Sequence, residues 1–100
     1  MIVNATRITV KPENEMELGQ TIHRLLGRAK ALKGCRSFHF YLDAADGSSS
    51  LLFSEWETST DLNNYLQSNT YAILKGAIKV LSARCIDSKA FVTDHTRSPL

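Results

Sequence analysis

The chain has 100 residues and a formal net charge of +2, with 43% hydrophobic and 22% charged residues. This length corresponds to one domain with a packed core, so disorder is excluded by composition. The small charge gives no reason to expect nucleic acid or an anionic membrane as a partner. No apolar run approaches the roughly 20 residues that span a bilayer, and Met1–Arg7 lacks the residue order of a signal peptide. We therefore expect a soluble cytoplasmic protein.

The first third of the chain predicts a strand followed by a helix. Residues 2–10 alternate between two faces and are rich in β-branched residues, which is typical of a strand. From Asn14, which is expected to form a capping box with Glu17, apolar residues recur every three or four positions as far as Leu32. We expect Gly34 to end this helix as a glycine at the C′ position.

The middle of the chain predicts a β-hairpin. Residues 36–43 alternate, with Phe38 and Phe40 on one face. A serine-rich stretch with the turn signal Asp46-Gly47 follows. Residues 51–57 are then expected to form the returning strand.

The last part predicts an interrupted helix and a final strand. A capping pattern at residues 58–61 precedes a short helix, and Ser68-Asn69-Thr70 interrupts it. Apolar residues within 71–81 recur every three or four positions and predict a further helix. Residues 84–92 read as a strand that closes a domain of residues 1–92, and the polar tail 93–100 is expected to be loosely held.

The order βαββαβ predicts an α+β, ferredoxin-like fold. Its four-stranded antiparallel sheet has the order 4-1-3-2, with both helices on one face. The strands carry apolar residues on both faces, as Phe38 and Tyr41 or Phe53 and Trp56 illustrate. Because the chain has no further element to cover the second face, we expect a homodimer that packs sheet against sheet.

Cysteines and histidines give no sign of a metal site or a disulfide. Cys35 and Cys85 begin the two edge strands of the predicted sheet, about three spacings of ~4.8 Å apart. This separation exceeds the roughly 7 Å that a disulfide allows between Cα atoms. His23, His39 and His95 have no metal-ligand spacing, so we expect no metal.

Four segments carry a resemblance to a known family. They are VKPENE at residues 10–15, KGCRSF at 33–38, SEWETS at 54–59 and LQSNTY at 66–71. With them the chain resembles the antibiotic biosynthesis monooxygenase domain family over residues 2–92. The resemblance implies a dimeric α+β barrel. In the family's cofactor-free members, an electron-rich substrate anion reacts with dioxygen in a pocket between helices and sheet.

The family also contains haem-degrading enzymes and an autoinducer-processing isomerase. The positions of the haem-degrading branch correspond here to Thr6, Tyr65 and Lys75. A lysine in place of the axial histidine argues against haem, so no cofactor is expected. The isomerase branch has histidines where Tyr65 and Thr70 stand, which argues against that reaction.

The phenol-oxidising branch implies candidate site residues. Its pocket uses Asn, Trp, Tyr and Arg groups; Tyr71 matches the tyrosine and Asn4 can supply the amide, but the set is incomplete. Polar residues on an otherwise apolar strand face favour a pocket, and a phenol hydroxyl can orient a substrate oxyanion. We therefore expect Asn4 and Tyr71 as catalytic residues. The expected substrate-binding residues are Thr6, Phe40, Trp56 and Tyr65. For the aromatic residues, a place in the core or an interface is the alternative.

These observations leave several functions open. The leading hypothesis is a cofactor-independent monooxygenase acting on a small quinol or phenolic substrate. The alternatives are an isomerase-like relative and a non-catalytic dimeric module that binds a small aromatic ligand or a partner protein. RNA binding shares the topology, but residues 51–57 are acidic and lack the glycines of an RNA-recognition strand.

Overall fold

The computed structural model describes the backbone of residues 1–91 and the side chains of residues 1–82. The elements are β1 (Ile2–Val10), α1 (Glu15–Lys30), β2 (Cys35–Leu42), β3 (Ser49–Trp56), α2 (Ser59–Leu66), α3 (Asn69–Leu81) and β4 (Ser82–Phe91), with a short 3₁₀ turn η1 (Pro12–Asn14) before α1. The predicted polar tail and Val92 lie outside the described residues.

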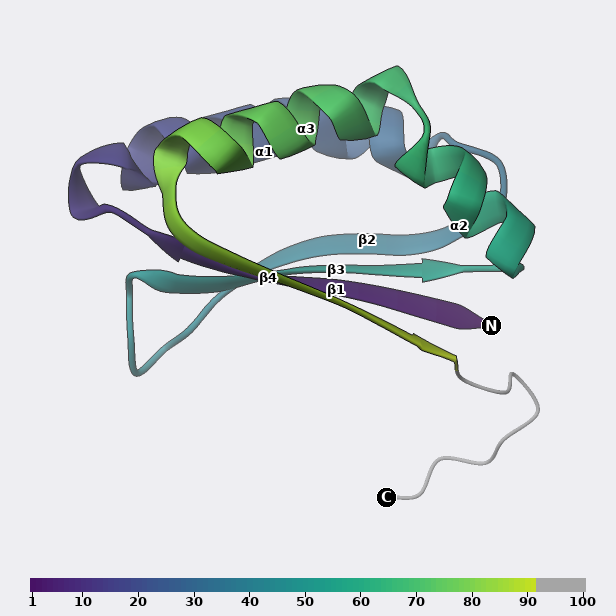
Figure 1. Ribbon diagram of the computed structural model, residues 1–100, viewed down its shortest axis with the longest axis horizontal. Helices are drawn as coiled ribbons and strands as arrows, with labels where there is room; N and C mark the ends of the chain where they lie inside the picture. Colours follow the sequence, from purple (N-terminus) through teal and green to yellow (C-terminus); the bar gives the residue numbers. More distant parts are fainter. Residues whose placement is uncertain (92–100) are drawn as a thin grey trace.

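The strands form one antiparallel sheet in the order β2-β3-β1-β4. Figure 1 shows the helices on one face of this sheet, with the opposite face uncovered in the single chain. The predicted ferredoxin-like topology is therefore confirmed. No helix among the described residues is long and apolar enough to cross a bilayer.

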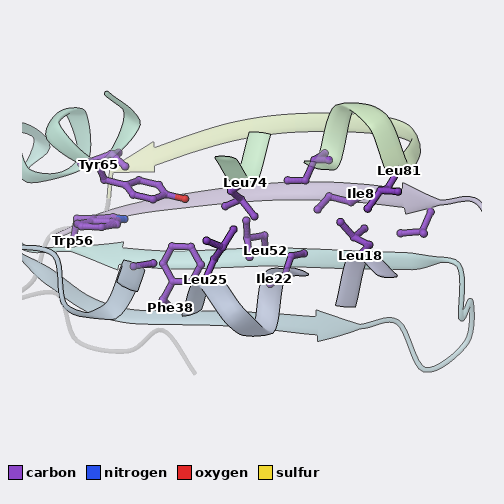
Figure 2. Packing of buried hydrophobic residues seen from close by; sticks show 14 of the residues in the cluster. Ile8, Leu18, Ile22, Leu25, Phe38, Leu52, Trp56, Tyr65, Leu74 and Leu81 are labelled. Carbon is purple, nitrogen blue, oxygen red and sulfur yellow. The ribbon is translucent and has the colours of Figure 1, made fainter. Parts of the chain in front are cut away.

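Alternation along the strands separates a buried face from an open face. On β1, buried and less buried residues alternate from Ile2 to Val10, and β3 shows the same pattern. The buried residues face the helices and form one core, in which Ile8, Trp56 and Leu62 are fully enclosed. Figure 2 shows this core running the length of the sheet beneath the helices. Its apolar area provides the main driving force for folding.

The start of α1 differs from the prediction. Asn14 occupies the N-cap position, but its side chain makes no capping hydrogen bond. Its amide nitrogen instead donates to the backbone oxygen of Leu81, 3.1 Å away. The expected capping box with Glu17 is therefore wrong, because a tertiary contact with the end of α3 takes the amide that the local motif would use.

The end of α1 also differs. The helix ends at Lys30, and Ala31 is its C-cap, so Gly34 is not the C′ residue. Gly34 nevertheless has a φ of 81°, in the left-handed region that glycine favours. It forms the tight turn into β2, where its carbonyl oxygen accepts a hydrogen bond of 2.8 Å from the backbone N–H of Glu57.

The interruption between α2 and α3 was predicted correctly. Thr58 caps α2 by accepting a hydrogen bond from the Asp61 N–H, and Ser68 caps α3 by accepting one from the Tyr71 N–H. The Ser68 hydroxyl also donates to the backbone oxygen of Tyr65, 2.6 Å away. These bonds satisfy helix-end groups, and they fix α2 and α3 as two separate helices.

The predicted hairpin turn is a six-residue loop, residues 43–48, between β2 and β3. The Asp43 carboxylate accepts hydrogen bonds from two loop N–H groups, and the Asp46 carboxylate accepts two from Ser48. The hydrogen bonds from Ser48 lower the pKa of Asp46, since they favour its charged form. Side-chain hydrogen bonds thus hold the hairpin loop.

Candidate functional site

Four of the six expected site residues lie toward one end of the helix-covered layer, and Thr6 lies nearer the middle of the sheet. Asn4 lies opposite Ser54 in the register of β1 and β3, and Thr6 lies opposite Leu52. Trp56 is the last residue of β3, two positions after Ser54, which pairs with Asn4. The other two residues of this group, Tyr65 and Tyr71, stand on α2 and α3 on either side of the helix interruption.

Phe40 does not belong to this group. It pairs with Leu52 in the register of β2 and β3, and it lines a cavity of about 290 Å³ near the β2–β3 hairpin. The structure therefore brings Asn4 and three aromatic residues toward one end of the layer. Thr6 and Phe40 lie on either side of Leu52 in the middle of the sheet, and Phe40 also faces the cavity at the hairpin end.

The aromatic residues form a contiguous cluster around Tyr65. The Tyr65 ring stacks on Trp56 with centroids 4.8 Å apart, and it meets Phe38 and Tyr71 edge-on at 5.7 and 5.0 Å. Such offset and edge-to-face contacts suit the quadrupoles of the rings. Figure 2 shows Tyr65 over Trp56, with its hydroxyl oxygen directed along the core toward Leu74. Tyr65 and Trp56 are 2% and 0% exposed, so their rings are part of the core, as the alternative interpretation proposed.

The Trp56 indole shows how a polar atom is satisfied within this cluster. Its Nε1 donates to the Ser54 hydroxyl, 2.9 Å away. Phe38, the register partner of Ser54 on β2, completes the apolar surroundings. A buried indole N–H usually finds such a partner, and here it also fixes the orientation of the ring against Tyr65.

Asn4 and Thr6 place polar groups on the covered face of the sheet, and they are only 9% and 3% exposed. No side-chain hydrogen bond joins Asn4 to another residue in the part of the chain that the structure describes. Among the described residues, no fully buried side-chain nitrogen or oxygen lacks a hydrogen-bond partner, so the Asn4 amide is not an orphaned buried group. Its place on the covered face of β1 puts an amide where a molecule bound between the sheet and the helices would meet it.

Asp61 is buried, although the sequence predicted it only as part of the capping pattern at residues 58–61. Within residues 1–82 it is the one buried carboxyl group, at 8% exposure. It stands one helical turn before Tyr65, and its side chain packs against Gly34. The spacing of four residues from Tyr65 on one helix face was the signal that could have identified it as buried.

Cys35 is a free thiol at the start of β2. Burial raises the pKa of Cys35. The charge of Lys30 and the hydrogen bond to the Ser37 backbone oxygen lower it, but they offset the effect of burial only in part. A raised pKa keeps the sulfur protonated and weakly nucleophilic. Its surroundings are therefore those of a structural cysteine.

The polar groups near the cluster are amide and hydroxyl groups, the Asp61 carboxylate on α2, and the Lys75 ammonium nitrogen, which lies 6.0 Å from the centre of the Tyr71 ring. His23 and His39 are exposed, on α1 and on the open face of β2. Among the described residues, no three His, Cys, Asp or Glu side chains gather as ligands for a metal ion. The site can therefore offer shape, an apolar environment and hydrogen bonds to a bound oxygen atom, as in sites where the ligand itself is the reactive group.

Comparison with known proteins identifies the family to which the chain belongs. The family model described as "Antibiotic biosynthesis monooxygenase" matches residues 1–73. The chain belongs to this family. No curated protein matches the sequence.

Solved structures share the fold at low sequence identity. A candidate antibiotic biosynthesis monooxygenase from Deinococcus radiodurans is 13% identical, with a TM-score of 0.89 and 97% of each chain covered. Rv0793 from Mycobacterium tuberculosis is 20% identical, with a TM-score of 0.86; 96% of this chain and 98% of that chain are covered. A candidate antibiotic biosynthesis monooxygenase from Nitrosomonas europaea is 14% identical, with a TM-score of 0.85 and coverage of 92% and 98%. These likenesses show the fold, which many chemistries share.

Proposed function

We propose that the protein is a cofactor-independent monooxygenase that acts on a small quinol or phenolic substrate. The observation that carries this proposal is the position of the Asn4 amide, which lies on the helix-covered face of β1 toward the end of the sheet that holds the aromatic cluster. Membership of the antibiotic biosynthesis monooxygenase family supports the reaction class. A cytoplasmic location, the absence of a cofactor and a domain of residues 1–92 are parts of the same proposal.

In this proposal the substrate supplies the electrons. For an anthrone, the ring methylene and dioxygen give a ring carbonyl and water, so one oxygen atom enters the product and the other is reduced to water. The reactive species is the substrate anion, whose oxygen carries the negative charge. Asn4 donates a hydrogen bond to this oxygen, and the Tyr71 hydroxyl orients it. Groups aimed at a charge in an apolar site can contribute much of the rate.

The test is oxygen uptake by the purified, metal-free protein with a panel of quinols, anthrones and hydroxylated naphthalenes. We expect uptake above autoxidation. Asn4→Ala is expected to lower kcat by about 10²-fold, the usual effect of removing one oxyanion donor. Tyr71→Phe is expected to lower kcat by about tenfold, which corresponds to a single weaker hydrogen bond of about 1.4 kcal/mol.

The matched controls are Asn64→Ala on the exposed side of α2 and Tyr41→Phe on the open face of the sheet. Both are expected to retain the wild-type rate. If kcat fell equally in the controls and in the site variants, Asn4 and Tyr71 would have no specific role in the reaction. An absence of uptake across the whole panel would instead favour the isomerase-like or ligand-binding alternatives, and tight ligand binding without turnover would identify a binding module.

We further propose that the open face of the sheet forms a homodimer. On this face Tyr41, Leu51 and Arg7 lie side by side around one shallow pocket. Tyr41 is 51% exposed, and it contacts His39 with ring centroids 5.5 Å apart. A sheet face with exposed aromatic residues is suited to pairing with a second copy, because large aromatic side chains contribute most at the centre of interfaces.

Tyr41→Asp is expected to weaken the homodimer at least tenfold in Kd, because a charge must be desolvated where an aromatic ring is buried. Analytical ultracentrifugation over a concentration series measures this change. Ile73→Asp is the matched control, since Ile73 is 49% exposed on α3 and lies on the helical layer. A wild-type monomer at all concentrations, or equal weakening by both variants, would contradict the proposed interface.

A further inference from the structure

A cavity at the hairpin end of the molecule has no role in the proposed reaction. It has a volume of about 290 Å³ and lies between the first turns of α1 and the β2–β3 hairpin. In Figure 1 the start of α1 and the hairpin stand at the same end of the sheet, whereas α2 stands at the other. We propose that this cavity is a second binding site, for a small apolar molecule that carries a protonated amine.

The walls of the cavity are mainly apolar. They are formed by Val10 and Leu18, which belong to the buried core, and by Phe40 and Leu42 of β2. The volume is near the lower end of the roughly 300–1,000 Å³ that is usual for small-molecule pockets. The cavity therefore fits a ligand with a single aromatic ring or a short aliphatic body.

Two glycines, which have no side chain, leave this space open. Gly19 of α1 and Gly47 of the hairpin loop both line the cavity. A Cβ atom added at Gly19 would meet no other atom within 4 Å. Glycine inside a helix costs about 1 kcal/mol relative to alanine, and at Gly19 no close contact in the described structure requires it.

The polar side chains of the cavity offer hydrogen-bond acceptors. The Ser48 hydroxyl donates to the Asp46 carboxylate at 2.7 Å, and the Ser50 hydroxyl donates to the Ile8 backbone oxygen at 3.2 Å. Their hydrogens are therefore engaged, and their remaining lone pairs can only accept. A serine hydroxyl has one hydrogen and two lone pairs, so both residues favour a ligand that donates.

Glu15 adds a negative charge to the same cavity. In residues 1–82 the one ion pair joins Arg36 and Glu57, far from the hairpin end. The Glu15 carboxylate is thus available to a cation. An ammonium group has three donors and no acceptor, which matches the accepting side chains of Glu15, Ser48 and Ser50. This combination selects an amine over a neutral or anionic molecule of the same shape.

The probes for this site are 2-phenylethylamine and 3-phenylpropionate, which have the same ring and opposite charges. Each is titrated into the ¹⁵N-labelled wild-type protein, and the amide shifts of residues such as Leu18, Gly19 and Gly47 are followed. We expect saturable shifts at the cavity with the amine and at least tenfold weaker binding of the carboxylate. Shifts that do not saturate, that lie elsewhere, or that are equal for both probes would overturn the proposal.

Two independent variants test the site, so the test still works if one of them fails to fold. Gly19→Leu is expected to fill the cavity and weaken amine binding at least tenfold, whereas Gly27→Leu is the control, because Gly27 is also an open position on α1. Glu15→Gln keeps the shape and is expected to weaken binding severalfold by removing the charge. Unchanged binding in both Gly19→Leu and Glu15→Gln would overturn the proposal. Oxygen uptake is a separate readout, so either proposal can fail alone.

Discussion

Tyr65→Ala is expected to destabilise the protein by about 3–5 kcal/mol, the usual cost of truncating a buried aromatic residue to alanine. Tyr65 is 2% exposed and contacts the rings of Trp56, Phe38 and Tyr71. Removing it leaves a cavity between α2 and the sheet and ends three aromatic contacts. Because small domains are stable by only about 5–15 kcal/mol in total, this variant is expected to lose a large share of the protein's stability.

Urea unfolding followed by circular dichroism and by the fluorescence of Trp56, the single tryptophan, measures this effect. Tyr65→Phe keeps the ring and is expected to lose only about 1 kcal/mol, the net contribution of a typical hydrogen bond. Val80→Ala, at a position that is 73% exposed on α3, is the control for truncation outside the core. If Tyr65→Ala were no more costly than Val80→Ala, the aromatic cluster would not be part of the core.

Gly34→Ala is expected to destabilise the protein by about 2–5 kcal/mol, from left-handed backbone strain together with overpacking. Gly34 has a φ of 81°, where a Cβ atom is unfavourable. A Cβ atom at this position would also overlap the side chain of Asp61 at the start of α2. The turn into β2 and the first turn of α2 would both have to move.

The matched control is the same substitution at Gly27, in the open part of α1. Gly27→Ala is expected to stabilise the protein by up to about 1 kcal/mol, because alanine is the better helix former. Midpoints of thermal or urea unfolding for the two variants should therefore shift in opposite directions. A Gly34→Ala variant as stable as the wild type would show that this turn can relax at no cost.

Periodicity predicted the element order and the topology of the sheet correctly. Alternation along residues 2–10 separated the face that the helices cover from the open face, since side chains point to opposite sides of a strand. The cap at Thr58 was also predicted correctly, because a cap is a contact between residues three positions apart. These features depend on neighbours in the sequence.

The ends of α1 show where local patterns fail. Asn14 has the residues of a capping box around it, yet its amide bonds to Leu81 at the end of α3. Gly34 adopts the expected left-handed conformation, but in the turn to β2 and not directly after the helix. In both cases a partner distant in sequence decides the outcome, and a local motif carries no information about that partner.

Among the candidate site residues, the sequence by itself determined that Asn4 and Thr6 share the covered face of the sheet, because strand parity fixes that face. Only the tertiary structure decided that Tyr65 stacks on Trp56 and that Phe40 lines a separate cavity. Contacts between helices and sheet depend on packing in three dimensions. The shapes of the rings and the positions of the glycines determine which of many possible neighbours come into contact. Alternation and helical period, in contrast, are properties of the chain itself.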